Sequence, residues 1–189
     1  MRYSIAFVAA ALASFVSAHG VISEGRGSGG ADMPGVGTPG RSINTLSSSE
    51  ADPSIIRANE MGGESSVCGR TQGGSPVNVA AAIATFLGGA GGAPAGAAGA
   101  GVAAGAGQGA SQGLPTADDD GIITMTFHQV DQDGAGPLTA QIDPTSGGTD
   151  PAAFQDAVII QNLPSHSTEA IMDFPVKVRS QHLTFHNTG

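Results

Sequence analysis

The alternation of apolar and polar residues in the C-terminal half predicts a series of β-strands. In residues 122–130 the apolar set is Ile123, Met125 and Phe127, and the polar set is Thr124, Thr126 and His128. Residues 138–142 alternate again, and residues 155–163 and 170–178 are rich in strand-forming types. Turns such as the Gly- and Pro-containing residues 131–137 separate them. Strands at this spacing without intervening helices predict an all-β fold, an antiparallel β-sandwich of immunoglobulin-like type with long loops.

The N-terminal 18 residues have the pattern of a secretory signal peptide. Arg2 precedes an apolar run over residues 5–16, and Val16, Ser17 and Ala18 offer a cleavage site. The run is shorter than the roughly 20 residues that span a bilayer. We therefore expect residues 1–18 to be removed, the mature chain to begin at His19, and the protein to be secreted without a membrane span.

Two helices and one low-complexity segment are expected between the signal peptide and the strands. Residues 75–87 predict a helix capped by Ser75, with Val79, Ile83 and Leu87 on one face. Residues 53–61 predict a second, short helix. Residues 88–110 hold 10 Gly and 10 Ala among 23 residues. Such a composition favours a disordered insert, because Gly is costly in a helix and small side chains pack poorly.

These segments divide the chain into four parts. Residues 1–18 are the signal peptide, and residues 19–87 form the first part of the secreted domain. Residues 88–113 form the Gly/Ala-rich linker. Residues 114–189 form a β-rich second part of the same domain, which we expect to be truncated at its C-terminal end.

Charge and cysteine content narrow the function classes. The chain carries 7 Lys plus Arg against 16 Asp plus Glu, a net charge of −9. A nucleic-acid binder needs a basic surface, so this class is excluded. Cys68 is the single cysteine. In a secreted protein it can be a free thiol, pair with another chain, or lack a partner in this sequence.

His19 is the sharpest candidate for chemistry. As a mature N-terminus it offers its α-amine and Nδ1, and one more imidazole would complete a three-nitrogen copper site, a histidine brace. His128, on the polar side of the best strand, is the expected second ligand, placed where its ring can reach solvent. His166, His182 and His186 are weaker candidates. The acids at 118–120 are expected to be solvated turn residues, since the full calcium-loop pattern is missing.

Three motifs together carry a resemblance to a known family. They are HGVI at residues 19–22, VCGRT at residues 67–71, and GIITMTFHQVDQDGAGP at residues 121–137. The chain resembles the Egh-type fungal virulence factors, which are secreted, appressorium-associated proteins. The resemblance covers most of residues 1–176. Family members continue into a Cys-rich tail, whereas residues 177–189 here hold no Cys.

The resemblance implies a secreted, infection-associated protein that acts at the cell surface or host interface, with cell-wall polysaccharide or the host surface as partner. Two alternatives stay open. One is a histidine-brace copper protein similar to the lytic polysaccharide monooxygenases, with a monooxygenase-like sandwich and His19 and His128 as ligands. The scarcity of aromatic residues, with no Trp, weakens that alternative. The other is a non-catalytic, structural cell-wall protein.

Overall fold

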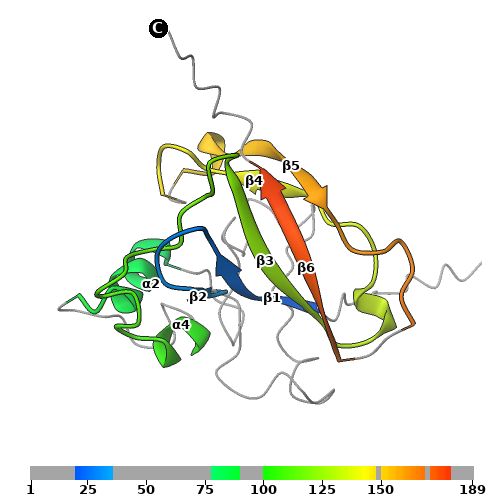
Figure 1. The fold of residues 1–189 in the computed structure, drawn as a ribbon, viewed down its shortest axis with the longest axis horizontal. Coiled ribbons are helices and arrows are strands. Elements are labelled where there is room, and N and C mark those ends of the chain that lie inside the picture. Colours follow the sequence, from blue (N-terminus) through cyan, green and yellow to red (C-terminus); the bar gives the residue numbers. More distant parts are fainter. Residues whose placement is uncertain (1–19, 36–77, 90–99, 148–149, 169–170, 180–189) are drawn as a thin grey trace, which may run out of the picture.

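A single antiparallel sheet organises the described part of the chain. The computed structural model describes residues 20–35, 78–89, 100–147, 150–168 and 171–179 (Figure 1). Its strands are β1 Gly20–Arg26, β2 Met33–Pro34, β3 Ile122–Gln129, β4 Ala140–Ile142, β5 Gln155–Gln161 and β6 Met172–Arg179. They lie in the order β2-β1-β3-β6-β5-β4, and every neighbouring pair is antiparallel. The all-β prediction is confirmed; a second sheet, as a sandwich requires, is not seen among these residues.

The alternation in β3 has the predicted consequence for the core. Phe127 is fully buried and packs with Leu163 and with Val176 of β6, and Met125 joins the same cluster from two residues earlier in β3. Since side chains alternate between the faces of a strand, the polar set of β3 lies on the opposite face. β3 and β6 pair along their whole length, from Ile122 opposite Arg179 to Gln129 opposite Met172. This long central pair fixes the register on which the site depends.

A second, smaller core forms beside the sheet, where α2 (Val79–Phe86) meets α4 (Ala100–Ala104) (Figure 1). Ala82, Phe86 and Val102 are fully buried there. The predicted helix therefore exists, but Asn78 caps it by accepting a hydrogen bond from the Ala81 N–H at 3.0 Å. Its buried face differs from the expected one, because Ala82 and Phe86 are turned inward towards α4.

The expectation of a disordered Gly/Ala-rich insert is wrong for residues 100–113. This segment forms α4 and a run of turns, and Val102 within it has no exposed surface. Glycine makes the packing possible: a Cβ on Gly109 would lie 2.4 Å from the Phe86 ring. The Gly109 N–H also donates to the Phe86 carbonyl at 3.0 Å. The small residues thus let a large aromatic ring approach the backbone, which composition alone does not reveal.

The glycine-rich chain after β1 is held against residues 113–116. The Ser28 N–H donates to the Thr116 carbonyl at 2.9 Å, and the Thr116 N–H donates to the Gly29 carbonyl at 2.9 Å. Gly30 has φ +80°, and a Cβ there would lie 1.9 Å from the Leu114 carbonyl oxygen. This close pairing joins the sheet to the α2–α4 core. Short 3-10 turns, η1 Gln132–Gly134 and η2 Pro151–Ala153, complete the described connections.

Several sequence predictions fall outside the described residues. They are the signal peptide, the helix at 53–61, the cap at Ser75, Cys68 and the end of the chain. No helix in the described ranges is both long enough and apolar enough to cross a membrane.

Candidate functional site

His128 lies near the end of β3, at the centre of the sheet. Its register partners are Val21 on β1 and Asp173 on β6. The residue is only 2% exposed, so the prediction of a solvent-reaching ring is wrong. β3 is a central strand between β1 and β6, so its residues have neighbours on both sides. Burial of a polar ring is costly without hydrogen bonds, so its partners are informative.

Asp173 is a hydrogen-bond partner of the His128 ring. The His128 Nδ1 and the Asp173 Oδ1 are 2.7 Å apart. An ionised carboxylate can only accept, so the hydrogen belongs on Nδ1 and the ring donates it. The two side chains differ sharply in surroundings, at 3% exposed for His128 and 65% for Asp173. A surface carboxylate therefore holds one edge of a buried imidazole.

Sequence reasoning missed Asp173, which lies 45 residues after His128. Nothing local marks it as a site residue. Only the antiparallel register of β3 and β6 brings it opposite His128, and that register depends on long-range packing. A search for acids in strands that neighbour the His128 strand could have found it, had the strand order been known.

The start of β1 lies at the same level of the sheet. Gly20 pairs with Gln129, and Val21 pairs with His128. A Cβ on Gly20 would lie 2.2 Å from a carbon of the Phe127 ring, so the β1 backbone lies directly against that ring. His19 precedes Gly20 in the sequence but lies outside the described residues. His128, one of the two predicted copper ligands, therefore lies beside β1, the strand that begins directly after His19, the other predicted ligand.

The remaining histidines and acids add no cluster to this site. His166 is exposed in the loop after β5, and His182 and His186 lie outside the described residues. Within the described ranges there is no group of three or more His, Cys, Asp or Glu side chains that could hold a metal. Asp118 acts as a turn residue, as expected, because its Oδ1 accepts from the Asp120 and Ile122 N–H groups at 3.0 and 2.8 Å.

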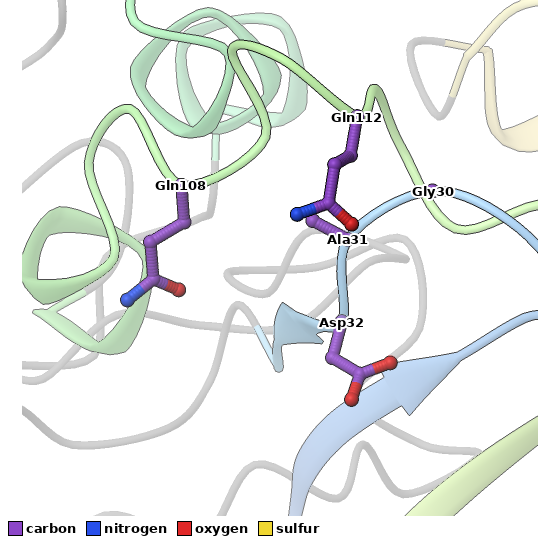
Figure 2. Close-up of a pocket in the computed structure, with 5 residues that line it drawn as sticks. All are labelled: Gly30, Ala31, Asp32, Gln108 and Gln112. Atoms are coloured by element: carbon purple, nitrogen blue, oxygen red, sulfur yellow. The ribbon is translucent and has the colours of Figure 1, made fainter.

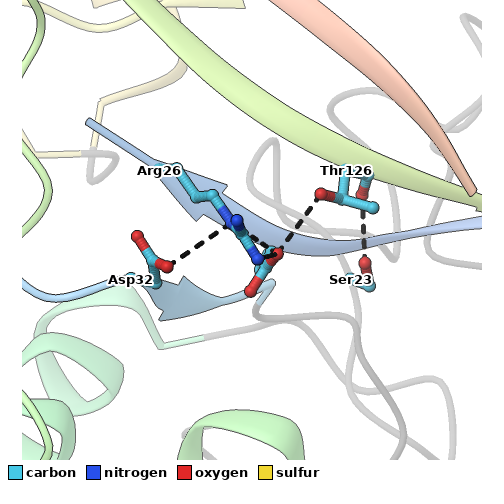
Figure 3. A network of polar contacts seen from close by, with 5 residues as sticks. Ser23, Arg26, Asp32 and Thr126 are labelled. Atoms are coloured by element: carbon cyan, nitrogen blue, oxygen red, sulfur yellow. Dashed lines mark hydrogen bonds and ion pairs between the residues drawn. The ribbon is translucent and has the colours of Figure 1, made fainter. Parts of the chain in front are cut away.

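A network of polar contacts lies further along β1 and β3 (Figure 3). The Thr126 hydroxyl donates to Glu24 Oε1 at 3.3 Å, and the Arg26 Nε donates to the same oxygen at 2.7 Å. Arg26 also lies 3.4 Å from Asp32. The hydrogen bond to Glu24 and the charges of Glu24 and Asp32 raise the pKa of Arg26 above its usual value. Arg26 therefore stays charged and ties β1 to the chain that leads into β2.

An open hollow adjoins this network on the side of the Gly/Ala-rich segment. It has a volume of about 480 Å³ and is lined by Gly30, Ala31, Asp32, Gln108 and Gln112 (Figure 2). Two carboxamides and one carboxylate can together donate and accept hydrogen bonds. The hollow lies beside β2 and the 108–112 turns, whereas His128 lies on β3. We therefore treat the hollow and the His128–Asp173 pair as separate features.

Comparison with known proteins defines the class. A sequence model described as "Egh16-like virulence factor" matches residues 17–182. The chain therefore belongs to the Egh16-like virulence factor family, in agreement with the resemblance noted above.

Among individual proteins, the chain is 42% identical over 221 aligned positions to the appressoria-specific virulence factor GAS2 of Pyricularia oryzae. A second GAS2 sequence from Pyricularia oryzae shows the same identity. Each alignment covers 95% of this chain and 76% of the relative. No solved structure matches.

Proposed function

We propose that this protein is secreted and acts in infection, at the fungal cell surface or the host interface. Membership of the Egh16-like virulence factor family carries the proposal, together with 42% identity to an appressoria-specific virulence factor. The signal-peptide pattern of residues 1–18 supports the route of export. Cell-wall polysaccharide and the host surface are the partners we expect.

Secretion is tested by expressing the full-length chain in a filamentous fungus and analysing the culture medium by mass spectrometry. The expected N-terminal peptide begins at His19. A charge-reversed variant, Arg2→Glu, should reduce export, because the positive residue before the apolar run would be lost. Retention of the wild-type protein inside the cell, or an N-terminus that still contains residues 1–18, would contradict secretion by this route.

A second candidate function is copper binding by a histidine brace formed by His19 and His128. The observation that favours it is the pairing of β1 with β3, which puts the residue after His19 opposite Gln129, next to His128. His128 is held by a carboxylate, as metal-binding imidazoles commonly are. Imidazole and amine nitrogens suit Cu(II). Bound copper would supply one-electron redox chemistry towards the C–H bonds of a polysaccharide.

The role of the amine separates a brace from general surface binding. The processed protein should bind one Cu(II), and adding one residue before His19 should weaken binding sharply although both rings remain. His128→Ala should weaken it as well, whereas His166→Ala, at an exposed histidine, should not. Isothermal titration with Cu(II) measures all four proteins. If the extended protein binds as tightly as the processed one, there is no brace, and a non-catalytic surface or cell-wall role is then the better explanation.

A further inference from the structure

We propose that the open hollow beside β2 binds a neutral, hydroxyl-rich sugar unit of a cell-wall glycan. The proposal rests on the proposed function above, in which cell-wall polysaccharide is a partner, and deepens it by naming a site and a class of sugar. The geometry that points to it is the hollow of about 480 Å³ lined by Gly30, Ala31, Asp32, Gln108 and Gln112 (Figure 2). This volume lies within the range of about 300–1,000 Å³ that is usual for small-molecule sites.

The backbone fixes the two glutamine side chains on one wall of the hollow. The Gly113 N–H donates to the Gly109 carbonyl at 2.8 Å, which closes a helical type of turn. Residues four apart in such a turn project to the same side, and Figure 2 shows Gln108 and Gln112 projecting in the same direction. The Gly109 N–H donates to the Phe86 carbonyl at 3.0 Å, so the turn is anchored on α2.

Residues 30–32 form a second wall, which is joined to the first. The Ala31 N–H donates to the Gly113 carbonyl at 3.1 Å. Gly30, with φ +80°, lies so close to the Leu114 carbonyl that any Cβ there would overlap it. Because both walls are folded and tied together, a ligand would not have to order them, which lowers the cost of binding.

The polar groups of the hollow are available to a ligand. Both glutamines are exposed, and among the described residues neither carboxamide has a hydrogen-bond partner. Each carboxamide can donate and accept, whereas the Asp32 carboxylate only accepts. The Arg26 Nε lies 3.4 Å from one oxygen of Asp32, so this carboxylate already has a cation beside it.

These groups select a ligand by its chemistry. An anion would be repelled by Asp32, a cation would compete with Arg26 for it, and an apolar ligand would find only the Ala31 methyl group. A sugar hydroxyl both donates and accepts, so a few hydroxyls can satisfy two carboxamides and one carboxylate together. None of the five lining residues is aromatic, so a large apolar contact is missing and we expect weak binding.

The test is an NMR titration of the ¹⁵N-labelled secreted protein. The probes are cellohexaose, laminarihexaose and chitohexaose, which are neutral, and oligogalacturonate, which is anionic. At least one neutral probe should shift the side-chain NH₂ signals of Gln108 and Gln112, with an affinity that is the same in low and high salt. Gln112→Ala should weaken binding about 2- to 10-fold, as expected for one lost hydrogen bond. Asp32→Ala should weaken it about 10-fold or more, since hydrogen bonds to a charged group are stronger.

Matched controls use exposed residues that do not line the hollow. Gln155→Ala on β5 removes a carboxamide, and Asp119→Ala in a turn removes a carboxylate. Both should leave the affinity for the neutral probe unchanged. Thermal melts show whether a loss of binding reflects unfolding. If a hollow variant unfolds, the glutamine NH₂ signals of the wild type carry the test.

The outcomes separate this site from the proposed function. If a neutral probe binds without shifting either glutamine signal, and equally well in both hollow variants, the site is wrong and a role at the cell wall stands. Preferred binding of oligogalacturonate that weakens in high salt would overturn the neutral class. If none of the probes binds, the sugar site is wrong, whereas secretion is decided independently by mass spectrometry of the medium. If the chain stays inside the cell and its hollow binds a neutral probe, the site stands and the proposed function fails.

Discussion

Val102→Ala tests whether the Gly/Ala-rich segment is part of the folded protein. Val102 has no exposed surface and packs with Phe86 and Ala82 of α2. A disordered insert would tolerate the change with no effect on stability. A packed segment would not, because the substitution removes two buried methyl groups and leaves a cavity.

The structure gives the size of the effect. Each buried methyl group contributes about 0.8 kcal/mol of transfer free energy. The cavity adds to this loss, since close-packed surroundings collapse only in part, and the free energy of unfolding should fall by about 2–3 kcal/mol. For a chain of this size each kcal/mol lowers the melting temperature by about 2–4 °C. We therefore expect Tm to fall by about 4–12 °C.

Val158→Ala is the matched control, with the same chemical change on β5 at a residue that is 43% exposed. It should cost less than about 1 kcal/mol, mainly through strand propensity. Urea unfolding and thermal melts of the two variants and the wild type make the comparison. If Val102→Ala is as stable as Val158→Ala, the α2–α4 core does not form and the packing argument is refuted.

Two further substitutions test the sheet and its polar face. Gly20→Ala should lower the free energy of unfolding by about 1–3 kcal/mol in urea titrations, because the new methyl group would overlap the Phe127 ring. Gly25→Ala, with no atom within 4 Å of the new carbon, should cost less; equal losses would contradict the reasoning. Arg26→Ala should change the unfolding midpoint little in moderate salt, since exposed ion pairs contribute little. The pKa of Arg26 is raised, so the stability that its ion pairs contribute is fully present below the ordinary pKa of arginine. It is lost only as pH rises through the raised pKa. A difference between wild type and Arg26→Ala that varied across neutral pH would refute this.

The strands that sequence could predict are those rich in strand-forming residues. Residues 122–130 correspond to β3, where Ile123, Met125 and Phe127 alternate with polar residues, and residues 155–163 correspond to β5, whose apolar residues 157–160 are consecutive. β1 was not predicted as a strand of its own, and its pairing explains why. Its register with β3 shifts between Ile22 and Glu24, a bulge that breaks the alternation.

The Gly/Ala-rich segment shows a different limit. The intrinsic cost of glycine in a helix argues for disorder, and that argument is local. The structure overrides it through tertiary contacts, because Gly109 accommodates the Phe86 ring and Val102 fills the remaining space. Sequence indicated α2 but not its partner, since the residues that complete this core are too small to produce a periodic pattern.

The local pattern was sufficient to single out His128 as a candidate site residue, but it could not predict which residues surround the ring. The alternation in β3 placed His128 on the face of the strand away from Phe127 and Met125. Both of these residues pack in the core, which confirms that they point inward. Burial of His128 and its contact with Asp173 depend on which strands become neighbours. Strand order is set by packing over the whole chain, so the polar partner of a strand residue cannot be derived from its own segment.

The two faces of β3 link the start of β1 to His128. On one face the Phe127 ring lies so close to Gly20 that a Cβ at position 20 would be 2.2 Å from one of its carbons. On the other face the next residue, His128, is held by Asp173. The contact at the start of β1 is therefore made by Phe127, the residue next to His128. A displacement of β1 would displace β3, and the reverse. If His19 and His128 bind one copper ion, Gly20 contributes to the site, because it lets β1 begin close to the Phe127 ring, next to His128.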